Sequence, residues 1–161
     1  MTLQSKSLLV ASLVFFFSSL GQARDNVSLY QLSLRAYVEA KAEQGGTADS
    51  IVVWDTDVLH DKYAVETFPQ KIGSITIEYL TTKSIMERYK RLGKAFSIVE
   101  ILPMRNYHDL LVVRCAEYSA GVRHGRLDLG VFGGYKVTWR FDSSKDEYVK
   151  INVERWLGLV M

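Results

Sequence analysis

Cysteine and proline are almost absent from this chain. Cys115 is its one cysteine, and Pro69 and Pro103 are its only prolines. A single cysteine cannot close an internal disulfide, so we expect the fold to be held together by a hydrophobic core. Because Cys115 lies inside an apolar strand pattern, a buried thiol is the favoured interpretation, with an intermolecular bridge as the alternative.

The chain has no large excess of charge of either sign. Its 20 Lys and Arg residues nearly balance its 18 Asp and Glu residues. Proteins that bind nucleic acid or anionic lipid usually carry a strongly basic surface. We therefore expect neither nucleic acid nor an anionic membrane surface as a partner.

The N-terminal segment has the pattern of a signal peptide. Lys6 precedes the apolar run 8–17, and small residues including Gly21 and Ala23 precede Arg24. A membrane helix needs about 20 apolar residues, more than this run supplies. We predict a cleaved signal peptide over residues 1–23 and export to the periplasm or the medium. An uncleaved anchor is the alternative.

After cleavage, residues 24–161 are expected to form a single α+β domain without a membrane span. No linker or internal repeat divides this part of the sequence. Asn26 lies in the sequence Asn-Val-Ser, an acceptor for glycosylation in a eukaryotic source. The same residue can instead cap a helix, because its side-chain oxygen accepts from free backbone amides.

Two segments have the spacing of apolar residues that predicts an amphipathic helix. The first is long, covers residues 25–44 and ends at Gly45. The second covers residues 82–92 and ends at Gly93. Glycine ends helices because it adopts the left-handed conformation at little cost.

Alternating apolar and polar residues predict strands over most of the remaining chain. The predicted strands are 74–80, 96–102, 110–118, 135–141 and 147–153, with further short strands near 63–68 and 127–132. Residues 51–54 are predicted as a short strand or a buried turn. The turn 142–146 should join the last two long strands as a hairpin. Long strands that follow the helices predict an α+β fold: a long N-terminal helix and a second helix packed on a curved antiparallel sheet of four to six strands.

This order of elements resembles the nuclear-transport-factor-2-like, cystatin-like α+β roll superfamily. The closest local similarity is the pair of C-terminal segments 133–142 and 147–156. The resemblance implies a cavity between helix and sheet. It also implies one of several functions: an isomerase or dehydratase, a small-ligand binder or a dimerisation module. Enzymes of the superfamily use a buried acid or histidine opposite a hydroxyl group, and no motif assigns such a role to a numbered residue here.

Motifs for catalysis or metal binding are weak. His60 and His108 are each followed by aspartate, but His124 is the only further histidine, and zinc needs three or four converging ligands. The acids Asp55 and Asp57 lack the further oxygen ligands of a calcium loop. The basic loop 123–126 could hold a phosphate or carboxylate, but as a solvated hairpin loop it needs no function, and that interpretation is favoured. We therefore predict no metal and no cofactor, and we identify no catalytic residue.

Aromatic residues supply the candidate binding site. A pocket with apolar walls and polar tips could be lined by Tyr30, Tyr37, Trp54, Tyr135 and Trp139, while packing in the core explains most of them without a ligand. The leading hypothesis is an exported non-enzymatic module that binds a small apolar ligand or a partner protein. One alternative is a small acid–base enzyme of the roll superfamily, with a buried acid or histidine against a tyrosine. A structural homodimer is the other.

Overall fold

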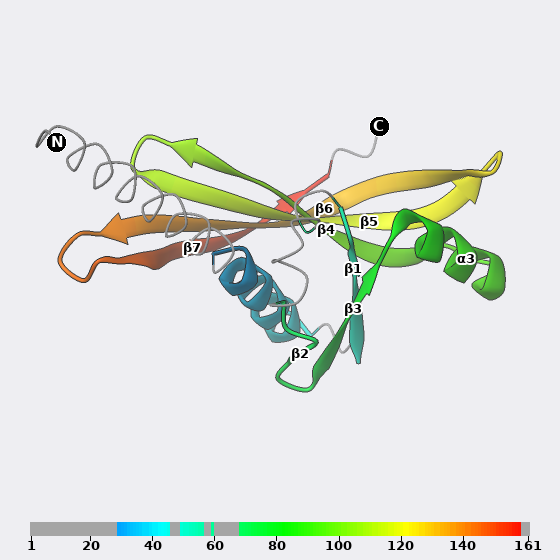
Figure 1. The fold of residues 1–161 in the computed structure, drawn as a ribbon, viewed down its shortest axis with the longest axis horizontal. Coiled ribbons are helices and arrows are strands. Elements are labelled where there is room, and N and C mark those ends of the chain that lie inside the picture. Colours follow the sequence, from blue (N-terminus) through cyan, green and yellow to red (C-terminus); the bar gives the residue numbers. More distant parts are fainter. Residues whose placement is uncertain (1–28, 46–48, 57–58, 60–67, 159–161) are drawn as a thin grey trace, which may run out of the picture.

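The computed structural model describes residues 29–45, 49–56, 59 and 68–158 (Figure 1). The predicted signal peptide, Asn26, His60 and nearly all of the predicted strand 63–68 lie outside the described residues. Among the residues described, no helix is long and apolar enough to cross a membrane.

The described chain forms one mixed sheet with a helix on each of its faces. The sheet order is β2-β3-β1-β4-β5-β6-β7. β1 pairs in parallel with both β3 and β4, and all other pairs are antiparallel. The strands are β1 Ser50–Trp54, β2 Lys71–Ile72, β3 Ile75–Leu80, β4 Phe96–Tyr107, β5 Leu110–Arg123, β6 Arg126–Asp142 and β7 Glu147–Leu157.

The predicted fold class is therefore wrong in two respects. The sheet has seven strands rather than four to six, and it is mixed rather than antiparallel. Alternation of residue types identifies a strand but does not identify its neighbours, so β1 could not be placed between β3 and β4 from sequence. The long helix predicted over 25–44 is also not shown: the described helix covers residues 29–43, and residues 25–28 lie outside the described residues.

β4, β5 and β6 are longer than predicted. Residues 127–132 and 135–141, expected as separate strands, belong to one strand, β6. Gly133 and Gly134 keep it continuous with φ angles of +138° and +153°. A Cβ at Gly134 would lie 2.1 Å from the carbonyl oxygen of Cys115, so only glycine fits between the strands.

The second helix agrees with its prediction. α3 covers Thr82–Leu92, and the side chain of Thr81 accepts a hydrogen bond from the amide of Ser84 at its start. Gly93, with φ +65°, ends it. The predicted hairpin after β6 is also present, because Asp142 pairs with Glu147 and its carboxylate accepts from the Ser144 amide at 3.0 Å.

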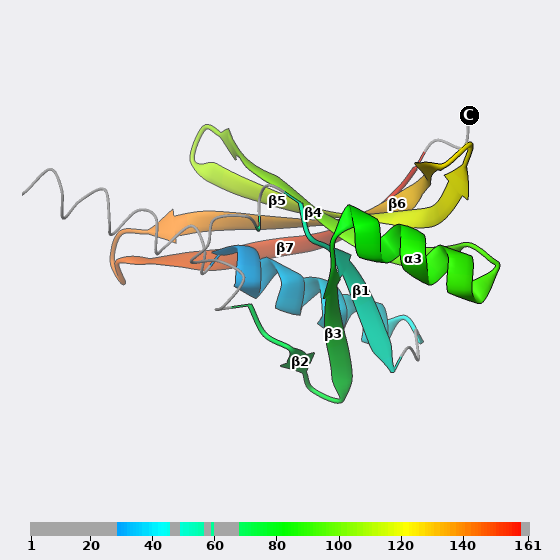
Figure 2. The ribbon, with the colours of Figure 1, turned by 45° about the vertical axis from the view of Figure 1, so that its right-hand side comes forward.

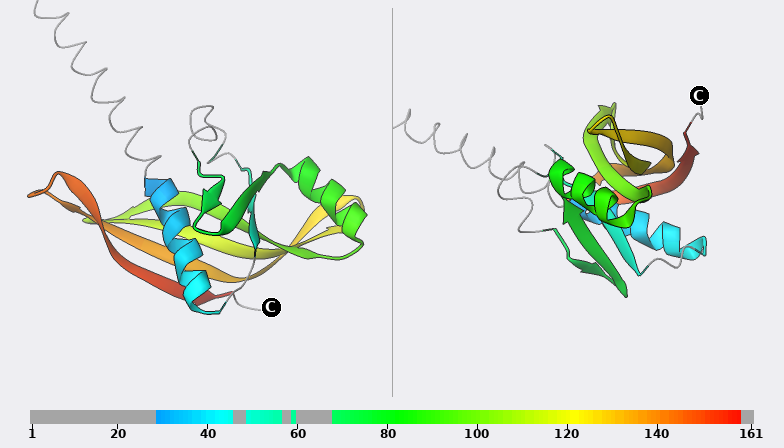
Figure 3. Two further views of the ribbon diagram at one scale, coloured as in Figure 1. Left: turned by 90° about the horizontal axis from the view of Figure 1, so that it is seen from below. Right: turned by 90° about the vertical axis from the view of Figure 1, so that its right-hand side faces the viewer.

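Alternate residues of the central strands pack against the two helices. Val53 and Val99 belong to the core cluster beneath helix 29–43. Their neighbours Val52 and Ile98 belong to the cluster that contains Ile85 of α3. Adjacent strand residues point to opposite faces, so the helices lie on opposite sides of the sheet. Figures 2 and 3 show them near different ends of the long strands.

Candidate functional site

The space between helix 29–43 and the sheet is filled by side chains. Leu34 and Tyr37 of the helix are completely buried against Val113 and Cys115 of β5. The Tyr37 and Tyr135 rings meet edge to face with centroids 5.4 Å apart. Close packing of this kind leaves the helix–sheet interface as a core, where the sequence predicted a cavity.

A buried polar cluster crosses this interface. The Tyr37 hydroxyl donates to Oε1 of Glu117 at 2.7 Å, and Lys41 Nζ donates to the same oxygen. Lys41 also lies 3.1 Å from the Tyr37 hydroxyl. Glu117 is only 6% exposed, so its negative charge depends on these two donors.

Two side chains at this interface, Tyr37 and Cys115, resist ionisation. Burial, together with the charge of Glu117, raises the pKa of Tyr37 far above its ordinary range. Burial and Glu117 also raise the pKa of the Cys115 thiol to about 12. Both groups therefore stay protonated near neutral pH, and Cys115 is an inert core residue instead of a nucleophile.

Four of the five predicted pocket aromatics lie between helix 29–43 and the sheet. Tyr30 accepts from the Met104 amide at 2.9 Å, where β4 is irregular. Tyr135 donates to Gln44 at 2.8 Å, and the Trp139 indole donates to Ser33 at 2.9 Å. With Tyr37, each polar tip joins the helix to the sheet.

The fifth aromatic is not brought together with the others. Trp54 belongs to the cluster around α3, on the opposite face, and its indole donates to Thr82 at 3.2 Å. The structure thus gives all five aromatics internal polar partners, and their role in ligand binding stays a prediction. Sequence reasoning missed Glu117 and Lys41, although an acid inside the apolar pattern of β5 was an available signal for a buried charge.

A groove of about 210 Å³ lies beside the predicted aromatics, between helix 29–43 and β7. Tyr135 is the one predicted pocket residue in its wall. The lining residues are Ala36, Glu39, Ala40, Glu43, Gln44, Tyr135, Lys150, Val153 and Arg155. Helix 29–43 forms one wall of the groove, which carries Glu39 and Glu43. β7 forms the other wall, which carries Lys150 and Arg155.

Of the histidine and acid motifs, His60 and Asp57 lie outside the described residues, and those described do not form a metal centre. In the part of the chain that the structure describes, no group of three or more His, Cys, Asp or Glu side chains could hold an ion. His108 and His124 occupy turn positions with φ of +58° and +50°. Asp109 pairs with Arg140 at 3.0 Å, and Arg123 of the basic loop pairs with Asp128 at 3.3 Å.

Comparison with known proteins gives no relative from which a function could be transferred. No protein-family model matches the chain, and neither a curated protein nor a solved structure shows significant similarity to it. The resemblance to the roll superfamily therefore stays a prediction, and function has to be argued from the geometry alone.

Proposed function

We propose that this domain is an exported, non-enzymatic binding module that takes up an extended segment of a partner protein along β7. The observation that carries the proposal is the groove between helix 29–43 and the last strand of the sheet. β7 pairs with β6 on one side and has no strand on the other among the described residues. An edge strand of this length offers a row of backbone N–H and C=O groups to an incoming strand.

An edge strand beside a helix is a known arrangement for peptide recognition. The peptide adds to the sheet through backbone hydrogen bonds, and alternate side chains enter the groove between strand and helix. Ala36 and Ala40 make the helical wall low enough for side chains to enter. Glu39 and Glu43 face a groove whose opposite wall carries Lys150 and Arg155, so a segment with both charges would bind in one direction.

The filled core argues for a partner protein over a small apolar ligand. The predicted ligand cavity is occupied by Tyr37, Tyr135 and Leu34, all nearly or completely buried. The apolar side chains that remain exposed on β7 are Ile151 and Leu157, at 49% and 74%. Apolar surface on a free edge is available to a protein segment.

One observation favours the acid–base enzyme as a second candidate. Glu117 lies within hydrogen-bonding distance of a tyrosine, which is the arrangement that the alternative requires. The same oxygen already accepts from Tyr37 and Lys41, and the side chain is almost completely buried. A substrate could reach it only after helix 29–43 had moved, so we assign this cluster to stability.

The proposal can be tested with a displayed library of random peptides and the purified chain 24–161. Selected peptides should bind the wild type and slow amide hydrogen exchange along β7. Ala40→Phe, which fills the groove, should weaken binding at least tenfold. Ala42→Phe is the matched control, because Ala42 is exposed on the same helix and does not line the groove.

Two results would contradict the proposal. Peptides that bind without protecting β7, or that bind Ala40→Phe as well as the wild type, would place recognition elsewhere. A dimer in sedimentation, with β7 protected only at concentrations where the dimer forms, would make a second copy of this chain the occupant.

A further inference from the structure

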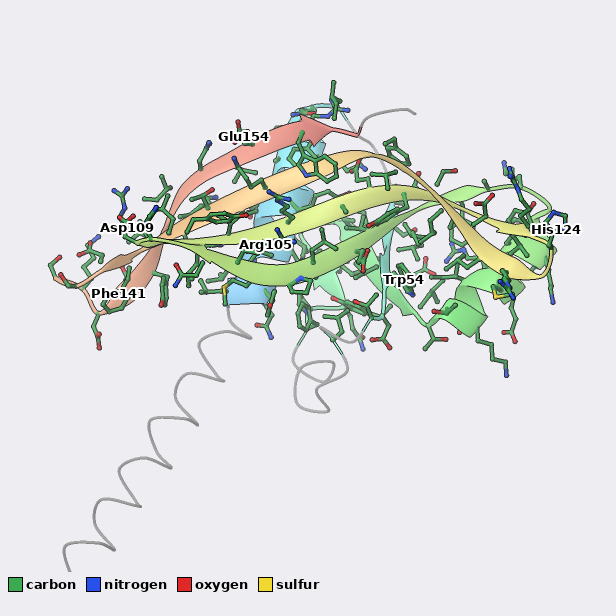
Figure 4. The ribbon with its side chains drawn as sticks, turned by 90° about the horizontal axis from the view of Figure 1, so that it is seen from above. Trp54, Arg105, Asp109, His124, Phe141 and Glu154 are labelled. Carbon is green, nitrogen blue, oxygen red and sulfur yellow. The ribbon has the colours of Figure 1, made fainter. Side chains whose placement is uncertain are left out.

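The face of β4–β7 opposite helix 29–43 is the second large surface of the domain, and Figure 4 looks onto it. Residues in register form rows across the four strands. The central row is Leu102, Arg114, Lys136 and Glu154. The row on one side is Glu100, Ala116, Gly134 and Trp156, and the row on the other is Arg105, Val112, Thr138 and Asn152.

This face carries two hollows that meet at Arg114. One hollow, of about 110 Å³, is mainly apolar and is lined by Leu102, Pro103, Arg105, Val112 and Arg114. The other, of about 270 Å³, is lined by Arg114, Lys136, Glu154, Arg155 and Trp156. Arg114 lines both, so this residue lies at their boundary.

The charges on this face are not balanced. Lys136 is neutralised by Glu154 at 2.5 Å. The other acid of the three rows, Glu100, accepts from Tyr118 at 2.7 Å. Among the described residues, neither Arg105 nor Arg114 has a carboxylate within salt-bridge distance. Arg114 is partly buried, and its guanidinium is free to pair with an anion.

Trp156, which lines the larger hollow, carries a second polar group without a partner. Its indole Nε1 is buried, and no acceptor lies within hydrogen-bonding distance of it in the described chain. A buried donor without an acceptor costs about 1–3 kcal/mol. The other indoles described, those of Trp54 and Trp139, both have acceptors.

We propose that the open face of β4–β7 binds a small amphipathic carboxylate. Its oxyanion lies against the Arg114 guanidinium in the hollow that Trp156 lines, and its apolar body crosses to Leu102, Pro103 and Val112. A carboxylate fits because a guanidinium donates two parallel hydrogen bonds to it. Arg105, at the far rim, adds attraction for the negative charge. This site and the β7 edge groove share Arg155, which lines both, but Arg114 and Trp156 line only the site on the open face.

The test uses the indole N–H signals of the ¹⁵N-labelled chain 24–161 in two-dimensional NMR. The chain has three tryptophans, and Trp156→Phe assigns the signal of interest by its loss. Octanoate should shift the Trp156 signal saturably and leave the Trp54 and Trp139 signals in place. Octanamide, which has the same body without the charge, and acetate, which has the charge without the body, should each bind at least tenfold more weakly.

Variants locate the site. Arg114→Gln should weaken octanoate binding at least tenfold. Arg114→Lys keeps the positive charge and should bind octanoate more tightly than Arg114→Gln. The lysine variant also serves as the test if the glutamine variant folds poorly. Arg123→Gln is the control, since Arg123 lies at the β5–β6 turn and pairs with Asp128. The proposal is overturned if octanamide binds as tightly as octanoate, if all three indole signals move together, or if Arg123→Gln weakens binding as much as Arg114→Gln.

Discussion

Glu117 should be the most sensitive polar position in the described chain. Replacing it by leucine removes the shared acceptor of the Tyr37 hydroxyl and the Lys41 ammonium. Tyr37 is completely buried and cannot turn to water, whereas 29% of the Lys41 side chain is exposed. Breaking a buried pair from one side costs about 3–5 kcal/mol, and the partial exposure of Lys41 places our expectation near 3 kcal/mol.

Glu117→Gln separates the hydrogen bond from the charge. The amide oxygen can still accept from Tyr37, so only the ionic contribution of Lys41 is lost. We expect a loss of about 1 kcal/mol in the free energy of unfolding, the upper end of the range for an ion pair with a partly exposed member. Glu78→Leu is the matched control, because its partner Arg88 is 23% exposed and Glu78 is 37% exposed. An ion pair with this much exposure to solvent contributes about 0–1 kcal/mol to the free energy of unfolding.

Urea unfolding at pH 7, followed by tryptophan fluorescence, measures these differences, provided that the slope against urea is unchanged. The expected order of destabilisation is Glu117→Leu, then Glu117→Gln, with Glu78→Leu smallest or close to the glutamine variant. If Glu117→Leu cost no more than Glu78→Leu, the cluster would not anchor helix 29–43, and the assignment of Glu117 to stability would be wrong.

Three further predictions concern Gly134, Cys115 and the N-terminal segment. Gly134→Ala should destabilise the fold by about 3 kcal/mol or more, because its Cβ would collide with the Cys115 carbonyl, and Gly130→Ala, where space is open, is the control in the same urea assay. Burial raises the pKa of Cys115 from 9.0 to about 12, so its contribution to stability is complete below pH 9 and is lost as the pH rises toward 12. The Cys115→Ala variant should therefore lose less stability than the wild type between pH 8 and 10. An equal loss in the two proteins would contradict this assignment. Expression with residues 1–23 in an exporting host should give a product beginning at Arg24 by mass spectrometry, and an intact Met1 would contradict the predicted signal peptide.

The sequence predicted individual elements better than their arrangement. The α3 boundaries, the β6–β7 hairpin and most strands follow from local signals such as Gly93 and the alternation of apolar residues. The parallel insertion of β1 and the seven-strand order depend on contacts between distant segments, which periodicity does not encode. β2, with only two residues, is too short to produce a pattern at all.

The candidate site shows the same division between local pattern and tertiary packing. The sequence by itself determined which residues are aromatic, that one cysteine cannot form an internal disulfide, and that the charges nearly balance. Only the tertiary structure decided that four of those aromatics join helix 29–43 to the sheet, that Glu117 meets Tyr37 across 80 residues of sequence, and that Arg114 lies between two hollows. The physical reason is that burial and partner choice depend on which faces of distant strands come together, and a local pattern carries no information about that pairing.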